Sequence, residues 1–358
     1  MKFVAFYLPQ YHEIPENNEW WGNGFTDWVN VKKAKKFFPN HNQPRIPLDD
    51  WYYDLSNEED IIKQIDIAKK YGVYGFCFYH YWFHGKLLLQ KPVEIFRQNK
   101  NIKFNYCFSW ANEPWARTWD GKNREYLIKQ EYGDEKDWAS HFYYFLPFFK
   151  DERYIKIDNM PMLLIYKAAS ITDFDDMVHC WNDLALKHGF SGVYLVNTLR
   201  DNSVNDNKNF LAHVEFEPAR SLFPPKMTLW KNRIRRYSVL AYNKIFKKNL
   251  LCNPIIPFNK IAKESLSKGN PRNTYGGVFM GWDNTPRKNQ LGTIVHQPSR
   301  QEFENFVKRK IESVRVNNDE NNQFVFINAW NEWAEGTYLE PDTENKYAYL
   351  EILSKYSK

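Results

Sequence analysis

Eight short runs of apolar, β-branched and aromatic residues alternate with longer segments of helical period along the chain. Several runs are almost continuously apolar, which is typical of parallel strands covered by helices on both faces. Strand followed by helix, about eight times over, predicts a (β/α)8 TIM barrel rather than a doubly wound sheet. The runs are Lys2 to Leu8, Val73 to Tyr79, Ile102 to Ser109, Met162 to Tyr166, Gly192 to Val196, His213 to Phe216, Gly277 to Met280 and Gln323 to Ala329.

Helical segments are predicted between these runs, and Ser56 with Glu59 forms a predicted capping box before the first of them. Two stretches, about 10–55 and 218–272, do not fit the repeat and are predicted to be loop insertions in a single barrel domain spanning 1–358. The helical segments are Glu58 to Tyr71, Val93 to Asn99, Asp137 to Phe149, Asp173 to His188 and Arg300 to Val314.

Polar, acidic and aromatic residues follow most of the predicted strands. Active sites of (β/α)8 barrels form at the C-terminal ends of the strands, so this ring of side chains predicts a site there. Aromatic residues make up 18% of the chain, which suits both core packing and stacking against sugars. The predicted substrate-binding residues at strand ends are Tyr11, His12, His80, Tyr81, Trp82, Trp110, Asn112, Glu113, Asn197, Glu215, Trp282, Asp283, Trp330, Asn331 and Trp333.

The richest cluster is AWNEWAEGT, residues 329–337, in which Glu332 and Glu335 lie three positions apart after an apolar strand. In a helical turn, side chains at this spacing share one face, with Cβ atoms about 5 to 6 Å apart. Glycoside chemistry commonly uses two carboxyl groups, one protonated and one ionised. The neighbouring charge and the apolar walls of Trp330 and Trp333 would separate the two pKa values. We therefore predict Glu332 and Glu335 as the catalytic residues, the alternative being a solvated start of the next helix.

Glu113 in WANEPW, residues 110–115, is a rival acid/base, because many retaining barrel glycosidases present that group as an Asn-Glu pair at a strand end. It follows the third predicted strand rather than the fourth, so we assign it to substrate binding. His12 and His80 either bind sugar hydroxyls or are structural. No Walker A, GxGxxG, HExxH or GxSxG motif stands in the required context, and neither a metal nor an organic cofactor is suggested.

The positive charge is concentrated in residues 226–249, which hold eight Lys or Arg and no acid, although the whole chain carries only +6. This segment is either a solvated surface helix or a contact with the inner membrane or a phosphorylated substrate. No partner among nucleic acids is expected. The apolar run at residues 2–9 is too short for a signal peptide and is followed at once by polar residues. No apolar run is long enough to span a membrane, so we expect a cytoplasmic protein.

Long motifs in a fixed order resemble the WbsX-like family of bacterial surface-polysaccharide biosynthesis proteins, which is in turn similar to glycoside hydrolase family 99, the retaining endo-α-1,2-mannosidases. The motifs are FYLPQYH (6–12), WWGNGFTDW (20–28), QPRIPLD (43–49), FYHYWF (78–83), FSWANEPW (108–115), GWDNTPR (281–287) and NAWNEWAEGT (328–337). Trp28, at the end of the second motif, joins the predicted substrate-binding residues. Asp27 departs from the glutamate that is commoner there in the WbsX-like group.

The resemblance implies a mechanism without a cofactor. Glu332 would deprotonate the sugar's own 2-hydroxyl, which attacks C1 to give a 1,2-anhydro sugar. Glu335 would protonate the leaving oxygen and then activate the incoming water or hydroxyl. The resemblance to the mannosidase family also implies mannose as one candidate sugar of the substrate.

Three functions are therefore weighed. The first is a retaining glycosidase or transglycosidase acting on an α-linked oligosaccharide or a lipid-linked glycan. The second is a conventional nucleotide-sugar-dependent glycosyltransferase of lipopolysaccharide, O-antigen or capsule synthesis, the role usually ascribed to the WbsX-like group. The third is a non-catalytic glycan-binding barrel, against which the intact glutamate pair argues.

Overall fold

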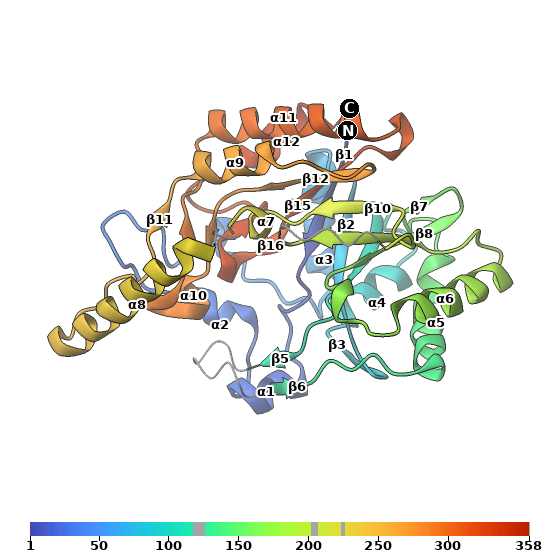
Figure 1. Ribbon diagram of the computed structural model, residues 1–358, viewed down its shortest axis with the longest axis horizontal. Helices are drawn as coiled ribbons and strands as arrows, with labels where there is room; N and C mark the ends of the chain where they lie inside the picture. Colours follow the sequence, from blue (N-terminus) through green and yellow to red (C-terminus); the bar gives the residue numbers. More distant parts are fainter. Residues whose placement is uncertain (117–125, 202–206, 223–225, 358) are drawn as a thin grey trace.

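All eight predicted runs form parallel strands, and these close into a barrel (Figure 1). Each strand pairs in parallel with the next, and β1 pairs with both β2 and β15, so no edge is left open. The (β/α)8 fold class is confirmed. The barrel strands are β1 (Lys2–Tyr7), β2 (Gly75–Phe83), β4 (Asn105–Trp110), β8 (Met160–Ile165), β9 (Tyr194–Leu199), β10 (Ala212–Glu215), β12 (Thr274–Phe279) and β15 (Phe324–Asn328).

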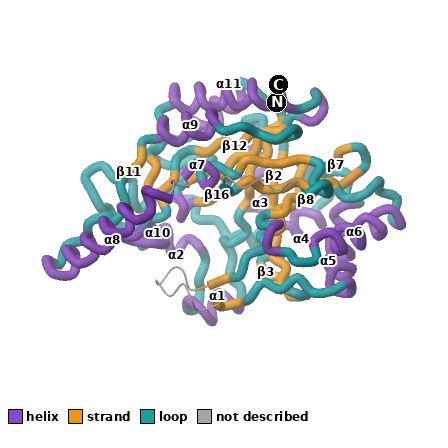
Figure 2. Tube along the Cα trace, in the orientation of Figure 1, coloured by secondary structure: helices purple, strands orange, loops and turns teal. Residues whose placement is uncertain are grey.

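The computed structural model describes residues 1–116, 126–201, 207–222 and 226–357, and the side chains of 226–232 are not described. Helices surround the barrel (Figure 2), and the five predicted helices are confirmed to within a few residues at each end. Among the described residues, the connection from β9 to β10 contains no helix. The covering helices are α3 (Glu58–Lys70), α4 (Lys91–Gln98), α5 (Glu135–Phe149), α6 (Phe174–Lys187), α9 (Phe258–Ser267), α11 (Arg300–Asn317) and α12 (Ala348–Ser354).

The predicted capping box before α3 is wrong. Asn57, rather than Ser56, is the N-cap residue, and its side chain accepts a hydrogen bond from the backbone N–H of Glu59. The asparagine is favoured because it stands one residue nearer the first helical turn, where its oxygen reaches the free amide groups. A complete capping box instead begins α11, between Ser299 and Glu302.

The stretch 10–55 packs against the C-terminal end of the barrel, where it adds α1 (Pro15–Trp21), α2 (Asp27–Lys32) and η1 (Leu48–Asp50). The stretch 218–272 contains α7 (Ala219–Leu222), α8 (Lys226–Phe246) and β11 (Ile255–Ile256), but it also contains α9, a regular barrel helix. Only its first part is therefore an insertion. Helix α8 extends away from the barrel beside α10 (Thr285–Lys288) in Figure 1.

Short elements complete the chain at both ends of the barrel. The strands are β3 (Lys86–Leu88), β5 (Trp115–Ala116), β6 (Tyr126–Ile128), β7 (Lys156–Ile157), β13 (Trp282–Asp283), β14 (Ile294–Val295), β16 (Asn331–Glu332) and β17 (Thr337–Tyr338). The 3-10 helices are η2 (Ala168–Ser170), η3 (Asn289–Leu291), η4 (Glu320–Asn322) and η5 (Trp333–Glu335). Together with α10, the short elements β13, β16 and η5 follow the last two barrel strands. These four elements carry most of the charged side chains of the candidate site.

Candidate active site

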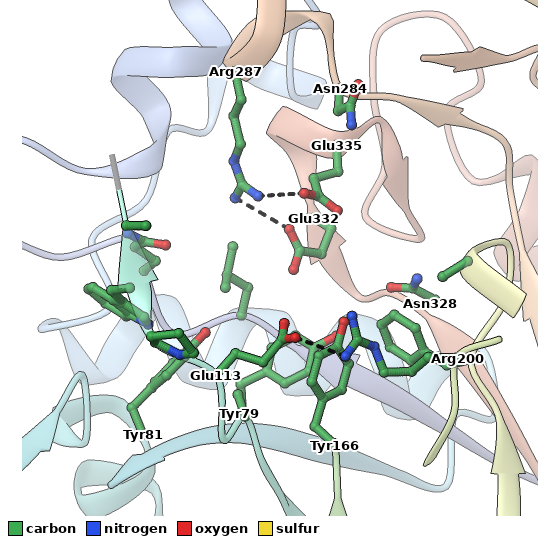
Figure 3. A pocket seen from close by; sticks show the side chains of 18 of the residues that line it. Tyr79, Tyr81, Glu113, Tyr166, Arg200, Asn284, Arg287, Asn328, Glu332 and Glu335 are labelled. Atoms are coloured by element: carbon green, nitrogen blue, oxygen red, sulfur yellow. Dashed lines mark hydrogen bonds and ion pairs between the residues drawn. The ribbon is translucent and has the colours of Figure 1, made fainter. Parts of the chain in front are cut away.

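A cavity of about 510 Å³ opens at the C-terminal ends of the barrel strands (Figure 3). Its walls combine carboxylates and cations with aromatic rings, including Tyr79, Tyr81, Trp115 and Trp282. Polar side chains that fix orientation, set among flat apolar faces, are the usual lining of a small-molecule site. The arrangement suits sugars, which offer both hydroxyl groups and C–H faces.

Glu332 and Glu335 both line this cavity. Glu332 ends the short strand β16 and is the N-cap residue of the 3-10 helix η5, which Glu335 ends. Gly336 ends the turn with φ of 64°, in the left-handed region. A side chain at Gly336 would place its Cβ 2.9 Å from the backbone N of Asp283, so the chain requires glycine to pass there. The shared face predicted for the two glutamates is present, although the turn is 3-10 rather than α-helical.

Arg287, on α10, links the two glutamates (Figure 3). Its Nη1 lies 2.8 Å from Glu335 Oε1, and its Nη2 lies 3.5 Å from Glu332 Oε2. The same guanidinium is held from behind by Asp27, which is fully buried on α2 and lies 2.8 Å from Nη2. One cation therefore bridges three carboxyl groups that come from both ends of the chain.

Burial is the main cause that raises the pKa of Glu332, to about 8. The neighbouring charge of Glu335 raises this pKa further, whereas Arg287 lowers it. Near neutral pH, Glu332 of the free protein is therefore largely protonated. A carboxyl group with so raised a pKa in a cavity is typical of an acid or base of a catalytic site.

Glu113 lies across the cavity from this pair (Figure 3). Its Oε1 accepts a hydrogen bond from Arg200 at 2.9 Å and lies 3.2 Å from the amine of Lys167. The guanidinium of Arg200 lies 4.1 Å from the centre of the Tyr166 ring. Two cations therefore fix the position of Glu113 on the cavity wall, and its role in binding stays a prediction.

Five of the predicted site residues line the cavity, and the other predicted residues do not. Those that line it are Tyr81, Glu113, Trp282, Glu332 and Glu335. The remainder are buried, and most of their polar groups bond within the protein. Position after a strand therefore locates a side chain at the correct end of the barrel, but does not tell whether it faces the cavity.

Tyr11, Trp28 and Asn331 lie behind the glutamate pair rather than in the cavity. The hydroxyl of Tyr11 donates to the backbone O of Asn331, and Trp28 Nε1 donates to the backbone O of Tyr53. The side chain of Asn331 accepts from Leu8 N at 2.7 Å and donates to Leu8 O at 2.9 Å. These contacts stabilise the loop that presents the glutamates. In this structure the three residues therefore support the site from behind and do not line the cavity.

Trp330 and Trp333 are also buried, and they do not form the apolar walls expected for the glutamates. Trp330 packs against Phe76, with ring centres 5.0 Å apart. Trp333 stacks on Tyr338 at 3.8 Å and donates from Nε1 to Glu340 Oε2 at 2.6 Å. Both rings pack inward because their neighbours there are aromatic.

His80, Trp82 and Trp110 lie in the core between β2, β4 and α5. Nε2 of His80 lies 2.8 Å from Nε2 of His141, and burial lowers the pKa of His80 to about 3. Trp82 stacks on His141 and donates to Asp137. These three predicted substrate contacts are therefore packing residues.

Glu215 and Asn197 have partners within the protein. Glu215 is fully buried and forms ion pairs with Lys310 and Arg220, and the two cations hold its pKa below the usual range despite burial. Asn197 lies 3.4 Å from the ring of His213. A buried and doubly paired carboxylate has no free position for a sugar hydroxyl.

Asp283, Asn112 and His12 are likewise placed away from the cavity. Asp283 lies 2.9 Å from Nε2 of His41. The side chain of Asn112 bonds to both backbone groups of Lys167. His12 is buried, which lowers its pKa to about 4. Asp283 and Asn112 thus connect loops at the end of the barrel, and His12 is enclosed by the protein.

Several cavity residues were not predicted, among them Arg287, Arg200, Tyr166 and Lys288. Tyr166 and Arg200 each directly follow a barrel strand, so the rule applied to the other strand ends would have found them. Arg287 is the last residue of the GWDNTPR motif, yet its place beside the glutamates depends on the fold of α10.

The sequence profile of the family described as Glycosyltransferase WbsX matches residues 3–353. Two proteins from strains of Xanthomonas campestris pv. campestris, each described as uncharacterized protein WxcX, are 34% identical over 355 residues. That match covers 97% of this chain but 48% of each relative, so the chain spans about half the length of these curated relatives.

Solved structures share the fold at low identity. The GH99 endo-alpha-mannosidase from Bacteroides thetaiotaomicron superposes with a TM-score of 0.56 at 14% identity, covering 99% of this chain and 96% of that one. A glycoside hydrolase-like protein gives 0.59 at 13% identity, covering 100% and 94%. The chain therefore shares its barrel fold with these solved structures. It belongs to the WbsX glycosyltransferase family.

Among the described residues, no helix is long and apolar enough to cross a membrane. The acidic stretch from Asp173 to Asp175 lies at the N-terminus of α6 and shares no residue with the cavity. Asp175 accepts hydrogen bonds from the side chains of Asn207 and Asn209. Its polar contacts are thus accounted for by the neighbouring loop.

Proposed function

We propose that the protein is a carbohydrate-active enzyme that makes or cleaves an α-glycosidic bond with retention, in bacterial cell-surface polysaccharide biosynthesis. The observation that carries the proposal is the placement of Glu332 and Glu335 in one cavity with Arg287 between them. Two carboxyl groups of unlike environment are what glycoside chemistry requires. Neither a metal nor an organic cofactor takes part.

In the proposed mechanism, Glu332 removes the proton of the substrate's 2-hydroxyl, and that oxygen attacks C1. Glu335 donates a proton to the leaving oxygen, which gives a 1,2-anhydro sugar and a released alcohol. Glu335, now ionised, takes a proton from the incoming water or sugar hydroxyl, which opens the anhydro ring at C1. Glu332 then returns its proton to the 2-oxygen, so both groups regain their first state.

The raised pKa of Glu332 supports its role as the base. A general base is most effective when its pKa lies near the working pH, and a raised pKa makes the carboxylate a stronger proton acceptor. Arg287 Nη1 lies 2.8 Å from Glu335 Oε1, so the guanidinium can hold this carboxyl group in place while it gives up and regains its proton.

The proposed substrate is an oligosaccharide or a lipid-linked glycan, with mannose as one candidate sugar. Rings of Tyr79, Tyr81, Trp115 and Trp282 offer faces on which sugar rings can stack, and Glu113 with Arg200 offers hydrogen bonds. A lipid carrier would hold the glycan at the cytoplasmic side of the inner membrane. The proposal therefore includes peripheral contact with that membrane through the basic segment 226–249.

The family description favours a second candidate, a conventional glycosyltransferase of O-antigen, capsule or lipopolysaccharide synthesis that uses a nucleotide sugar. Such an enzyme transfers sugar only when the nucleotide donor is present. The glutamate mechanism needs no nucleotide, so the donor requirement separates the two candidates.

Mass spectrometry of products over time tests the proposal. Wild type, Glu332→Gln and Glu335→Gln are incubated with α-mannosyl oligosaccharides, with and without a lipid-linked acceptor. Product from wild type alone is the expected result, and its mass tells hydrolysis from transfer. Glu351→Gln, at an exposed position on α12, serves as the control. Turnover only after a nucleotide sugar is added would refute the glutamate mechanism, and unchanged turnover in both variants would refute the role of the pair.

A further inference from the structure

Helix α8 exposes an unusual set of large apolar side chains. Ile234, Tyr237, Tyr242, Ile245 and Phe246 are all exposed, with fractions from 43% for Tyr242 to 71% for Ile245. At 3.6 residues per turn, these positions fall within about half of the helix circumference, with Ile234 and Ile245 near the middle. The outward side of α8 is therefore an apolar stripe about three turns long.

Cations flank this stripe. Arg233 and Lys244 are exposed and border the stripe beside Tyr237, and Arg235 is exposed within its other edge. The segment 226–249 contains no acidic residue. An apolar stripe bordered by Arg and Lys is the arrangement of a helix that lies in the interface of an anionic bilayer. The positive charge and the apolar surface thus both favour an anionic lipid surface as the partner.

The opposite side of α8 is fixed to the body of the protein. Asn243 is buried, about 180° around the helix from Ile234, and its side chain donates to Leu250 O at 2.9 Å and to Gln290 Oε1 at 2.8 Å. At the edge of the stripe, Arg235 Nε also donates to the backbone O of Cys252 at 3.2 Å. These bonds hold α8 with its stripe turned away from the protein.

We propose that α8 docks on an anionic phospholipid surface, with the stripe of Ile234, Tyr237, Tyr242, Ile245 and Phe246 in the interface and the flanking cations on the lipid headgroups. A second copy of the chain is the weaker alternative, because pairing two such faces would bring like charges together. The docking names the partner of the membrane contact in the proposed function. It does not depend on the catalytic chemistry.

The docked helix is connected to the cavity wall. Gln290, which receives the hydrogen bond from Asn243, belongs to η3, directly after α10. Arg287 and Lys288 on α10 line the cavity. A bilayer under α8 would thus lie beside that wall of the cavity, where a glycan on a lipid carrier is presented.

Flotation of the full chain with lipid vesicles tests the docking. One set of vesicles mixes phosphatidylglycerol with phosphatidylcholine, and the other is phosphatidylcholine alone. We expect binding to the anionic vesicles only, weakened by added salt. A stripe variant, Ile245→Ser with Phe246→Ser, and a charge variant, Arg233→Gln with Lys244→Gln, should each bind at least about tenfold more weakly.

The matched control is Leu186→Ser, which removes a leucine that is 60% exposed on α6 and should bind like wild type. Because all five positions are exposed, thermal melts should show every variant folded. Equal binding by the stripe variant, no vesicle binding by wild type, or a dimer that the stripe variant dissociates would overturn the docking. Turnover of a soluble oligosaccharide should be equal in all variants, so failure of the proposed function is seen separately.

Discussion

Arg287 contacts the two glutamates unequally, at 2.8 Å from Glu335 and 3.5 Å from Glu332, while Asp27 holds it from behind. The positive charge lowers the pKa of Glu332, and the charge of Asp27 raises it. Arg287 and Asp27 therefore shift the pKa of Glu332 in opposite directions. Neither residue could be assigned this role from the sequence, because they are far apart in the chain and meet only after α2 and α10 pack together.

The first prediction concerns pH. If Glu332 is the base, wild-type kcat/KM rises with pH through about 8, since the group must be ionised before it accepts a proton. Arg287→Met should move this rise to higher pH, and Asp27→Asn should move it to lower pH, by about one unit each. Measurement of kcat/KM against pH for all three proteins checks this.

The double variant Asp27→Asn with Arg287→Met removes both charges together and is the control for damage to the fold. The pH at which kcat/KM of the double variant rises should lie between the values of the two single variants. A wild-type rate that instead decreases as pH passes 8 would make Glu332 the acid. Shifts in the same direction for both single variants would contradict the tuning.

Residues near the strand ends show which parts of the candidate site could be predicted from the sequence. Glu332 and Glu335 were found because the chemistry requires two carboxyl groups and because their spacing puts both on one face. Trp333, between them, faces inward to Glu340. The alternation of inward and outward side chains in so short a turn depends on backbone angles that no pattern of residue types specifies.

At the element scale, Gly336 sets the end of η5 and so the place of Glu335. Gly336→Ala adds a Cβ 2.8 to 2.9 Å from Asp283 and Arg45 in a left-handed conformation. We predict a loss of about 1 to 3 kcal/mol in the free energy of unfolding and a fall in kcat of about tenfold or more. Denaturant melts and steady-state kinetics measure the two effects.

Gly189→Ala is the matched control for this prediction. Gly189 also has positive φ, of 86°, but no atom lies within 4 Å of its added Cβ. It should lose only about 1 to 2 kcal/mol through backbone strain and keep full activity. Equal activity of the Gly336 variant and this control would show that the turn tolerates movement.

Elements with a strong period were predictable from the sequence, whereas the insertions were not. All eight strands and five helices follow from the alternation of runs, because burial on both faces of a parallel sheet leaves a plain signature. The stretch 10–55 was expected only to decorate the barrel. It supplies Asp27 to Arg287 and His41 to Asp283, so it supports the glutamate pair.

At the scale of the whole molecule, two buried carboxyl groups oppose stability at high pH. Burial raises the pKa of Glu332 to about 8 and that of Glu340 to about 7, above the value of an unfolded glutamate. At these two groups the folded protein binds more protons than the unfolded chain, so their contribution to the free energy of unfolding falls as pH rises from about 5 to 8.

Glu332→Gln should remove its share of this loss, because glutamine stays neutral. We expect the variant to match wild type near pH 5 and to exceed it by about 1 to 3 kcal/mol near pH 9, with a higher Tm. Calorimetry at both pH values measures this. Glu351→Gln, at an exposed position, is the control and should follow wild type throughout. A variant less stable than wild type at pH 9 would contradict the prediction.

The division of 1–358 into one barrel domain remains a prediction, as does location in the cytoplasm. A single cooperative transition in these melts would support the former. The last strand, β15, closes the barrel on β1. The bridge from Asp27 through Arg287 to Glu335 likewise spans most of the chain.

That long reach sets a time order during synthesis. At about 5 to 20 residues per second, roughly 15 to 60 seconds separate the emergence of Asp27 from that of Glu335. A nascent chain carries the aromatic wall of β2 and β4 early, but has no paired glutamates until the barrel can close. The nascent chain therefore lacks the complete cavity until Glu335 has emerged and β15 can pair with β1.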